Sequence, residues 1–362
     1  MKYLKHKVYG VLFRLFKNTP VKDNRISFVI DSRESFKGNL DYIKKEFERR
    51  GNFEFHFFYK DKLSFSSFKS LAGSRYIFLN DNFFPFAFMK FNDGNTIVQL
   101  WHAPGASKKF GGSVEGEDRE VLSRISDNID YLITTSDKVQ DQYCEAFQIS
   151  RSKIKALGLP RMDYYFENHD LSRLKDDFCN KYNISNEKKI ILYAPTFRDE
   201  ERFNNVFDFL NLDKFNRELG DDYVLALRLH PTIRNLFGDE ISSRAGFVNV
   251  SDWESEQELM LISDMLITDY SSIMIEYGIL NRPIIFFTYD LDSYLKNERG
   301  FYYDFKKTVP GPIVYTSDEL IDTVKNDEFD LHKISEFVRT QFDAIDGESS
   351  RRVVDFLLNE GR

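Results

Sequence analysis

The chain has 362 residues, of which 42% are hydrophobic and 30% are charged, a composition typical of folded globular proteins rather than disordered or fibrous ones. This length favours two domains, each with its own core. The formal net charge of −8 argues against a general nucleic-acid-binding protein. Cys144 and Cys179 are too few for a disulfide framework or a zinc cluster, so both are expected to be free thiols.

The first 18 residues predict a basic amphipathic helix. Its apolar residues recur at helical spacing, namely Leu4, Val8, Val11, Leu12, Leu15 and Phe16. Its basic residues are Lys2, Lys5, Lys7, Arg14 and Lys17, and no acidic residue precedes Asp23. Two interpretations are open: segment 1–20 lies on an anionic membrane surface, or it packs its apolar stripe on the rest of the protein. Because charges interrupt the apolar stretches, we expect neither a signal peptide nor a membrane-spanning helix.

Strand-like and helix-like segments alternate along the remaining chain. Strands are predicted in the first half near 26–31, 53–59, 75–80, 96–102, 131–135 and 153–157, with helices such as 40–50 and 138–147 between them. Strands are predicted in the second half near 189–194, 223–229, 247–250, 265–268, 283–288 and 312–315, with helices near 208–219, 255–263 and 271–280. This alternation predicts parallel sheets covered by helices on both faces.

The predicted fold class is therefore α/β, with two doubly wound Rossmann-like domains facing a central cleft. We place an N-terminal domain at 21–165 and a C-terminal domain at 166–335. A last helix near 333–359, most of it in segment 336–362, is expected to pack back towards the N-terminal domain.

Two of the six histidines, His102 and His230, follow strand-like segments at matching places in the two halves. Ligands bind at the carboxyl ends of such strands, and a neutral imidazole near pH 7 suits general-base catalysis. A structural role for each histidine is the alternative. His102 precedes a small-residue loop and then Lys108 and Lys109, which could attract an anion on the acceptor side.

The segment 265–277 is an apolar strand that ends at Thr268, a polar turn and an amphipathic helix. Asp269 or Ser271 is expected to cap that helix, so that its free N–H groups and the hydroxyls of Ser271 and Ser272 form an anion site. Glu276 lies one turn later on the same face, where a carboxylate could hold ribose hydroxyls. An ordinary capped helix with a solvated glutamate is the alternative.

Arg198 at another strand end and Arg299 beside a glycine are further candidate phosphate ligands. Each could instead form a surface ion pair. The sequence contains no P-loop, GxGxxG, CxxC or HExxH motif, which disfavours nucleotide hydrolysis, nicotinamide redox chemistry and zinc hydrolysis.

Six ordered motifs resemble those of the CDP-glycerol glycerophosphotransferase family, the teichoic-acid primases and polymerases of Gram-positive bacteria. They are Gln99-Leu-Trp-His102, Gly158-Leu-Pro-Arg161, Tyr193-Ala-Pro-Thr-Phe-Arg198, Leu229-His-Pro231, Thr268-Asp-Tyr-Ser-Ser272 and Glu298-Arg-Gly-Phe-Tyr302. One departure is Ala103-Pro104, which stands where the family usually has Gly-Thr.

The resemblance implies a GT-B fold and transfer of a polyol phosphate from CDP-glycerol or CDP-ribitol, most simply CDP-glycerol, to a hydroxyl, with release of CMP. His102 would be the general base. The donor would contact Arg198, His230, Thr268, Asp269, Ser271, Ser272, Glu276 and Arg299. The acceptor would be a polyprenyl-linked saccharide or a polyol-phosphate polymer of the teichoic-acid or capsule type, at the cytoplasmic face of the cell membrane. We expect no metal and no cofactor, since no carboxylate cluster forms an evident metal cage.

Two other functions remain open. A GT-B glycosyltransferase that uses a nucleotide sugar such as a CMP-sugar would carry similar sites. A non-catalytic homologue would bind lipid-linked polymer or nucleotide without turnover.

Overall fold

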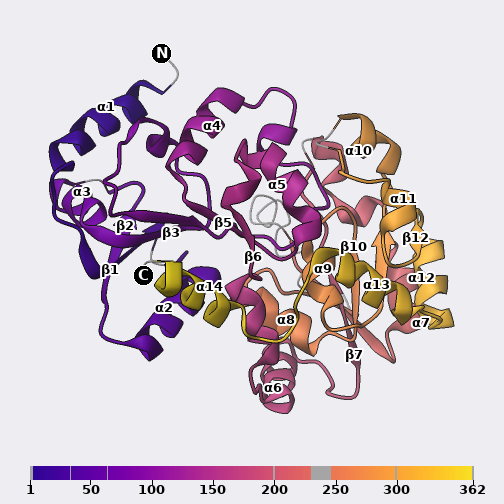
Figure 1. The fold of residues 1–362 in the computed structure, drawn as a ribbon. Helices are drawn as coiled ribbons and strands as arrows, with labels where there is room; N and C mark the ends of the chain where they lie inside the picture. Colours follow the sequence, from indigo (N-terminus) through magenta and orange to yellow (C-terminus); the bar gives the residue numbers. More distant parts are fainter. Residues whose placement is uncertain are drawn as a thin grey trace. The chain divides into compact units, whose positions relative to one another are not determined.

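The computed structural model describes residues 3–32, 34–62, 64–198, 200–229, 246–297 and 300–360. The chain divides into two compact units: unit 1 comprises Met1–Phe166 and Thr340–Arg362, and unit 2 comprises Glu167–Arg339. Each unit is an α/β structure built on a parallel sheet, which confirms the predicted fold class (Figure 1). Within the described ranges, no helix combines the length and the apolar character needed to cross a bilayer.

The sheet of unit 1 has the strand order β2-β1-β3-β4-β5-β6 in the part of the chain that the structure describes. Its strands are β1 (Lys22–Ile30), β2 (Glu54–Tyr59), β3 (Ser74–Leu79), β4 (Thr96–Gln99), β5 (Tyr131–Thr134) and β6 (Ile154–Ala156). The described pairings are all parallel, so the carboxyl ends of the strands lie along one edge. The order changes direction between β1 and β3, which makes that edge a topological switch point.

Helices cover both faces of this sheet. They are α1 (Leu4–Phe13), α2 (Asn39–Arg50), α3 (Phe65–Ala72), α4 (Arg119–Asn128), α5 (Gln140–Phe147) and α14 (Ser349–Glu360). On one face, Phe47 of α2 and Val353 of α14 pack with Phe28 and Phe78 of the strands. On the other face, the 3-10 helix η2 (Phe84–Phe88) contacts α1 and α4. The aromatic segment 83–89 contains η2 and is mainly core, since Phe83, Phe86 and Met89 are buried.

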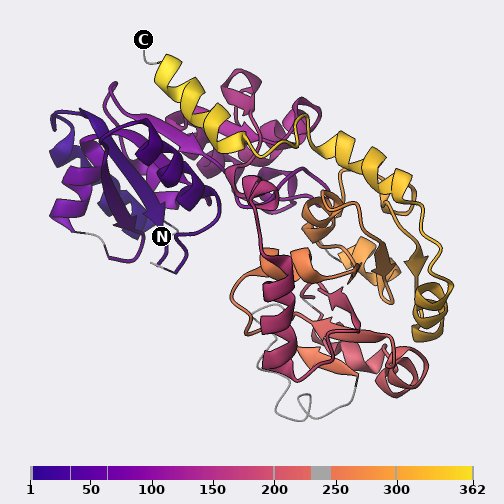
Figure 2. The ribbon, with the colours of Figure 1, turned by 90° about the horizontal axis from the view of Figure 1, so that it is seen from below.

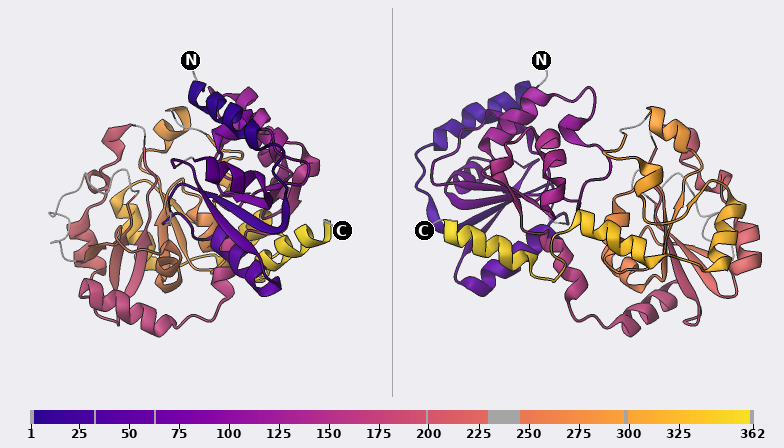
Figure 3. Two further views of the ribbon diagram at one scale, coloured as in Figure 1. Left: turned by 90° about the vertical axis from the view of Figure 1, so that its left-hand side faces the viewer. Right: turned by 45° about the vertical axis from the view of Figure 1, so that its right-hand side comes forward.

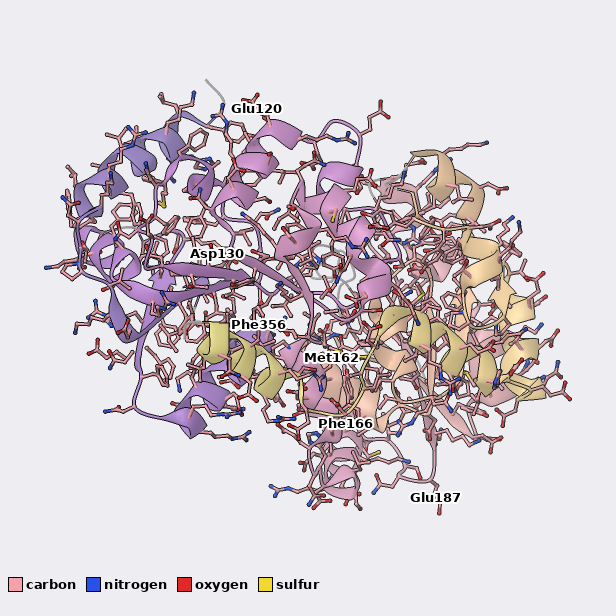
Figure 4. All side chains as sticks on the ribbon, in the orientation of Figure 1. Glu120, Asp130, Met162, Phe166, Glu187 and Phe356 are labelled. Carbon is pink, nitrogen blue, oxygen red and sulfur yellow. The ribbon has the colours of Figure 1, made fainter. Side chains whose placement is uncertain are left out.

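The C-terminal helix α14 is joined tightly to unit 1, where it lies beside α2 (Figure 3). Asp163 caps its start by accepting from the N–H groups of Ser349 and Ser350, each at 2.8 Å. Gly158 has a φ of +86°, and a Cβ there would collide with Ser349, so this position requires glycine. Phe356 of α14, labelled in Figure 4, sits edge-on to Tyr131 with ring centroids 4.8 Å apart.

The single last helix expected near 333–359 is instead two helices. α13 (Leu331–Gln341) packs on unit 2, where a Cβ at Gly278 would lie 2.7 Å from Val338. A turn containing Gly347, with a φ of +73°, separates it from α14. Figure 2 shows the two helices as successive yellow segments. The chain is non-helical from 342 to 348, and Gly347 lies two residues before the start of α14.

Unit 2 has the strand order β12-β11-β10-β7-β8-β9 within its described residues. Its strands are β7 (Lys189–Tyr193), β8 (Tyr223–Leu227), β9 (Phe247–Asn249), β10 (Met265–Thr268), β11 (Ile284–Phe287) and β12 (Ile313–Val314). These pairings are parallel as well, and the order changes direction between β7 and β10. That is the order of a doubly wound dinucleotide-type fold, in which ligands bind beside the switch point.

The helices of unit 2 are α6 (Leu171–Tyr182), α7 (Leu212–Leu219), α8 (Glu256–Ile262), α9 (Ile273–Gly278), α10 (Leu291–Asn297), α11 (Phe305–Thr308), α12 (Ser317–Asn326) and α13. Phe215 of α7 and Leu320 of α12 pack with Ile191 and Phe287 of the strands. Thr316 begins α12 with a capping box in which Glu319 reaches back to the N-cap backbone.

The twelve predicted strands coincide with β1 to β12, with ends that differ by a few residues. The largest difference is at the start of β1, which begins at Lys22 rather than at 26, and the next is at β4, which ends at Gln99 rather than at 102. The chain leaves the strand there because Trp101 adopts a φ of +63°, which is incompatible with extended pairing. His102 therefore lies beyond the strand, on a turn.

Candidate active site

His102 lies on the turn after β4, at the carboxyl edge of the unit 1 sheet, with 53% of its side chain exposed. Its Nδ1 atom is 2.7 Å from Oδ1 of Asp81, which follows β3, the neighbouring strand. Parallel pairing of β3 with β4 brings these two residues, 21 positions apart in sequence, to the same edge. The structure therefore supplies His102 with an acidic partner that sequence reasoning missed.

This contact defines the chemistry available to the imidazole. Partial burial raises the pKa of Asp81, but the hydrogen bond from His102, its charge and that of Lys60 outweigh burial, so the pKa of Asp81 lies below its ordinary value. An ionised Asp81 only accepts, so the proton of the contact belongs to Nδ1 of His102. In the neutral form of the imidazole, the lone pair of Nε2 can then accept a proton from a substrate hydroxyl.

The loop after His102, where the chain departs from the family pattern, is held by hydrogen bonds within unit 1. The Tyr143 hydroxyl is 3.2 Å from the Ala103 carbonyl and 3.0 Å from the Gly105 carbonyl. The Gly105 N–H donates to the Thr135 hydroxyl at 3.1 Å. The Ala106 N–H donates to Gln341, just after the return of the chain from unit 2, at 3.0 Å. These bonds fix the small-residue loop against the body of unit 1.

Lys108 and Lys109 follow this loop and are half-buried. Their role on the acceptor side stays a prediction.

Unit 2 presents its candidate residues beside the switch point between β7 and β10. Arg198 is only 1% exposed and lies between two carboxylates. Its Nη2 donates to Asp269 at 2.8 Å, and its Nε donates to Asp290 at 2.6 Å. Burial lowers the pKa of Arg198, but Asp269 and Asp290 more than offset this, so its pKa lies above the ordinary value and the group stays charged.

This geometry corrects the expected contact of Arg198 with a phosphate. The guanidinium is committed to protein groups, and it also donates to the Thr196 carbonyl. Its centre lies 4.7 Å from the Tyr270 ring centroid, and the Tyr270 hydroxyl donates to Asp290 at 2.9 Å. Arg198 therefore stabilises the framework under the strand ends instead of presenting a free cation there.

Thr268 and Asp269 are also turned inward. The Thr268 hydroxyl donates to the Ala194 carbonyl at 2.9 Å. Asp269 accepts from both the N–H and the hydroxyl of Thr196, at 2.9 and 2.7 Å, and from the N–H of Tyr270 at 2.5 Å. Of the two expected caps, Asp269 does not cap the following helix, because its oxygens accept these bonds; the N-cap position of α9 is Ser272, whose side chain makes no cap bond.

Ser271 and Ser272 are partly exposed on the turn that Asp269 fixes. The Ser271 hydroxyl accepts from the Ile273 N–H at 3.3 Å. Glu276, one turn further on, is 5% exposed, and its Oε1 accepts from Nε2 of Gln257 at 3.1 Å. The structure thus brings the serines and the glutamate to one turn and its helix, with Gln257 as an additional partner.

His230 and Arg299 lie outside the described residues, so the structure gives no geometry for these two predicted site residues. Within the described ranges, no group of three or more histidine, cysteine, aspartate or glutamate side chains is placed to hold a metal ion.

Asp81 and Asp290 were not among the predicted site residues, although the sequence places both of them just after predicted strands. Asp81 comes one position and Asp290 two positions after a predicted strand. In a parallel sheet such residues lie at the ligand-binding edge, so they could have been included as candidates.

Comparison with known families identifies the chain. The model of the family described as CDP-glycerol:poly(glycerophosphate) glycerophosphotransferase matches residues 11–359. The chain belongs to this family. The resemblance inferred from the six motifs is thereby confirmed.

Individual relatives agree with this assignment. The teichoic acid poly(ribitol-phosphate) polymerase of Bacillus spizizenii is 35% identical over 369 residues, which cover 98% of this chain and 59% of that protein. The teichoic acid glycerol-phosphate transferase of Staphylococcus aureus is 36% identical, covering 71% of this chain and 70% of the transferase. The chain therefore spans about three fifths of the length of the polymerase.

A solved structure of the wall teichoic acid polymerase TagF has the same fold, with a TM-score of 0.81 at 27% identity. The match covers 98% of this chain and 93% of that structure. A further TagF structure is a variant, H444N, soaked with CDPG. This chain therefore shares its α/β fold with that polymerase structure.

Asp81→Asn should lower kcat by about 10-fold or more, because an amide can donate to Nδ1 and so favour the tautomer that lacks a lone pair on Nε2. The measurement is steady-state release of CMP from CDP-glycerol, the donor that the family description names. Asp127→Asn, an exposed aspartate on α4, is the matched control and should leave kcat unchanged. Equal turnover in the two variants would remove Asp81 from the mechanism.

Arg198→Met should destabilise unit 2 by about 3–5 kcal/mol, since it leaves Asp269 and Asp290 buried without their cation. Chemical denaturation followed by a probe in unit 2 measures this. Lys307→Met removes an exposed cation paired with Asp304 and should cause no measurable change. A similarly small effect at Arg198 would contradict the framework role.

Proposed function

We propose that this chain transfers a polyol phosphate from a CDP-activated polyol to a hydroxyl group of a teichoic-acid-type acceptor and releases CMP. The observation that carries this proposal is the exposed His102 with its Asp81 partner, at a strand-end edge of a chain in this family. Both ribitol-phosphate and glycerol-phosphate enzymes are among its relatives. The choice of glycerol as the polyol therefore remains a prediction.

The proposed reaction is one displacement at phosphorus. The acceptor hydroxyl oxygen forms a bond to the β-phosphorus, the bond from that phosphorus to the bridging oxygen breaks, and CMP leaves with the bonding electron pair. Nε2 of His102 takes the hydroxyl proton as the new bond forms. The base must face the acceptor hydroxyl.

We assign the donor to unit 2, beside its switch point. The hydroxyls of Ser271 and Ser272 are placed to donate to diphosphate oxygens, where negative charge increases in the transition state. Glu276, oriented by Gln257, is the proposed partner of the ribose hydroxyls. His230 and Arg299 remain predicted donor contacts.

A membrane-surface role for segment 1–20 is part of the proposal. Four apolar side chains of α1 and its continuation form a stripe with exposed fractions of 48–70%, namely Leu4, Val8, Val11 and Leu15. Their spacing of four, three and four residues puts them on one helical face. The opposite face packs on unit 1 through Gly10 and Phe13, and Leu12 and Phe16 are half-buried. Packing thus accounts for part of the apolar surface but not for this stripe.

The basic residues and the surface next to the stripe also favour a membrane as the partner of this segment. Lys5, Lys7, Arg14 and Lys17 are exposed around the stripe and would attract anionic lipid head groups. Phe65 at the start of α3 is 64% exposed, and its ring centroid is 6.0 Å from that of Phe16. Aromatic and aliphatic groups flanked by lysines are typical of interfacial helices. Such a surface would bring the enzyme to a polyprenyl-linked acceptor at the cytoplasmic face of the membrane.

Incubation with CDP-glycerol or CDP-ribitol and a lipid-linked acceptor should release CMP, quantified by chromatography. His102→Ala should lower that turnover by about 100-fold or more, the scale of a lost general base. The donor KM should change little, because the donor residues belong to unit 2.

The same assay separates the competing functions. Turnover of a CMP-sugar without turnover of either CDP-polyol would indicate a glycosyltransferase. Absence of turnover with all donors, with retained nucleotide or polymer binding, would indicate a non-catalytic homologue. Full activity of His102→Ala with a CDP-polyol would refute the assignment of the base.

Val11→Asp combined with Leu15→Asp should lower co-sedimentation with phosphatidylglycerol-containing vesicles several-fold, because burying two carboxylates in the interface is unfavourable. Turnover of a soluble acceptor should not change. Point substitutions are preferable to deletion of 1–18, which would also remove the buried Phe13. Leu171→Asp, at a 43% exposed leucine of unit 2, is the matched control. If both variants bind vesicles as the parent does, the stripe is not a membrane contact.

A further inference from the structure

The peptide that carries His102 has an unfavourable backbone conformation. Trp101 has a φ of +63°, the left-handed region that side chains with a Cβ rarely adopt. Such conformations persist where the surrounding structure enforces them, and they occur often at functional sites.

The conformation of Trp101 determines where His102 points. Leu100 still donates its N–H to the Leu79 carbonyl at 2.9 Å, as a strand residue would. The chain then reverses, and the Trp101 ring stacks on Phe110 with ring centroids 5.2 Å apart. The centroid of the His102 ring lies 4.1 Å from that of the Trp101 ring, and Nδ1 of His102 contacts Asp81. A Trp101 relaxed to negative φ would move the imidazole away from Asp81.

Asn39, the first residue of α2, supplies the restraint. Its side-chain Nδ2 donates to the Trp101 carbonyl at 2.6 Å, and its Oδ1 accepts from the Arg161 N–H at 2.9 Å. Nδ2 also lies 3.4 Å from Oδ1 of Asn80. Asn39 is 1% exposed, so these bonds are shielded from water. One amide thus connects the strand ends of β1, β3, β4 and β6 beside the unit 1 switch point.

Arg161 adds a second restraint on the same segment. Its Nη1 donates to the His102 carbonyl at 3.2 Å, while its own N–H is the group that Asn39 accepts. The carbonyls of Trp101 and His102 are therefore both hydrogen-bonded to groups from other strand ends. The two contacts of Asn39 need a donor and an acceptor on one short planar side chain. An asparagine amide supplies both.

We infer that Asn39 is a positioning residue for the transfer reaction, which holds the strained Trp101 peptide and through it orients the His102 base. This inference rests on the proposed function, in which His102 accepts the proton. Asn39 acts through the backbone of its neighbours, since its own amide is buried and used within unit 1. Loss of its donor would allow Trp101 to relax and would break the contact between His102 and Asp81.

Unit 1 offers a matched control. Asn95 is a second buried asparagine, 7% exposed, before the amino end of β4. Its Nδ2 donates to the Ala72 and Ser74 carbonyls at 3.0 and 2.6 Å, and its Oδ1 accepts from the Asn92 N–H. Asn95 therefore ties backbone segments together as Asn39 does, but at the opposite edge of the sheet from His102.

The experiment compares Asn39→Asp with Asn95→Asp in the full chain. A carboxylate keeps the acceptor for Arg161 but cannot donate to Trp101. Asn39→Asp should lower kcat by about 10- to 100-fold, the scale of a misplaced catalytic group, with the KM for the CDP-polyol within about twofold of the parent. Asn95→Asp should keep the parent kcat, although both variants should unfold at lower temperature than the parent.

A nitrogen-15 NMR spectrum of the histidine rings gives a readout that a merely structural role would not change. His102, assigned by comparison with His102→Ala, should show a protonated Nδ1 in the parent and in Asn95→Asp. That preference should be lost in Asn39→Asp. Should Asn39→Asp fail to fold, Asn39→Ser, which is small and uncharged, is measured in the same way.

Parent kcat in Asn39→Asp, or an unaltered His102 spectrum, would overturn the inference. Normal turnover by His102→Ala would contradict only the proposed function, because His102 would then not be the base. The NMR comparison of Asn39→Asp with Asn95→Asp still tests whether Asn39 orients the ring.

Discussion

The parallel direction of the strands is the constraint on which both candidate sites depend. In each sheet the carboxyl ends of the strands share one edge, so residues far apart in sequence become neighbours there. Asp81 meets His102 across β3 and β4, and Thr196 meets Asp269 across β7 and β10. The change of strand order then leaves space for helices to diverge on either side. The strand order alone therefore determines which loops, and so which residues, can contribute to a site at this edge.

The two units use charge in different ways at these edges. In unit 2, Arg198 and its two aspartates are fully buried, and they fix the loops that follow β7, β10 and β11 relative to one another. In unit 1, His102 and Asp81 are about half exposed. A buried ion pair restricts geometry because breaking it is costly, whereas an exposed imidazole can exchange a proton with a substrate. The first arrangement suits a platform for a bound donor, and the second suits a base.

The fold could be predicted largely from the sequence because the strands are short, apolar and separated by helical periodicity. That His102 and Ser271 follow strands could be predicted for the same reason, although β4 ends three residues earlier than expected. The orientation of side chains at those ends could not. Whether Arg198 faces solvent or the interior depends on Asp290, which lies 92 positions away, and this partner is not visible in local pattern. The role of Asn39 could not be predicted either, because its partners Trp101 and Arg161 follow other strands, β4 and β6.

The division of the chain has a consequence for its synthesis. Unit 2 occupies a continuous stretch, whereas unit 1 is completed only by α14, whose Val353 and Leu357 belong to its core and whose Leu357 carbonyl accepts from the Tyr76 hydroxyl. On the ribosome, all of unit 2 is made before that helix exists. Until α14 is made, the part of the sheet face that α2 does not cover therefore stays exposed, and a nascent chain interrupted near residue 340 would present it to chaperones and proteases.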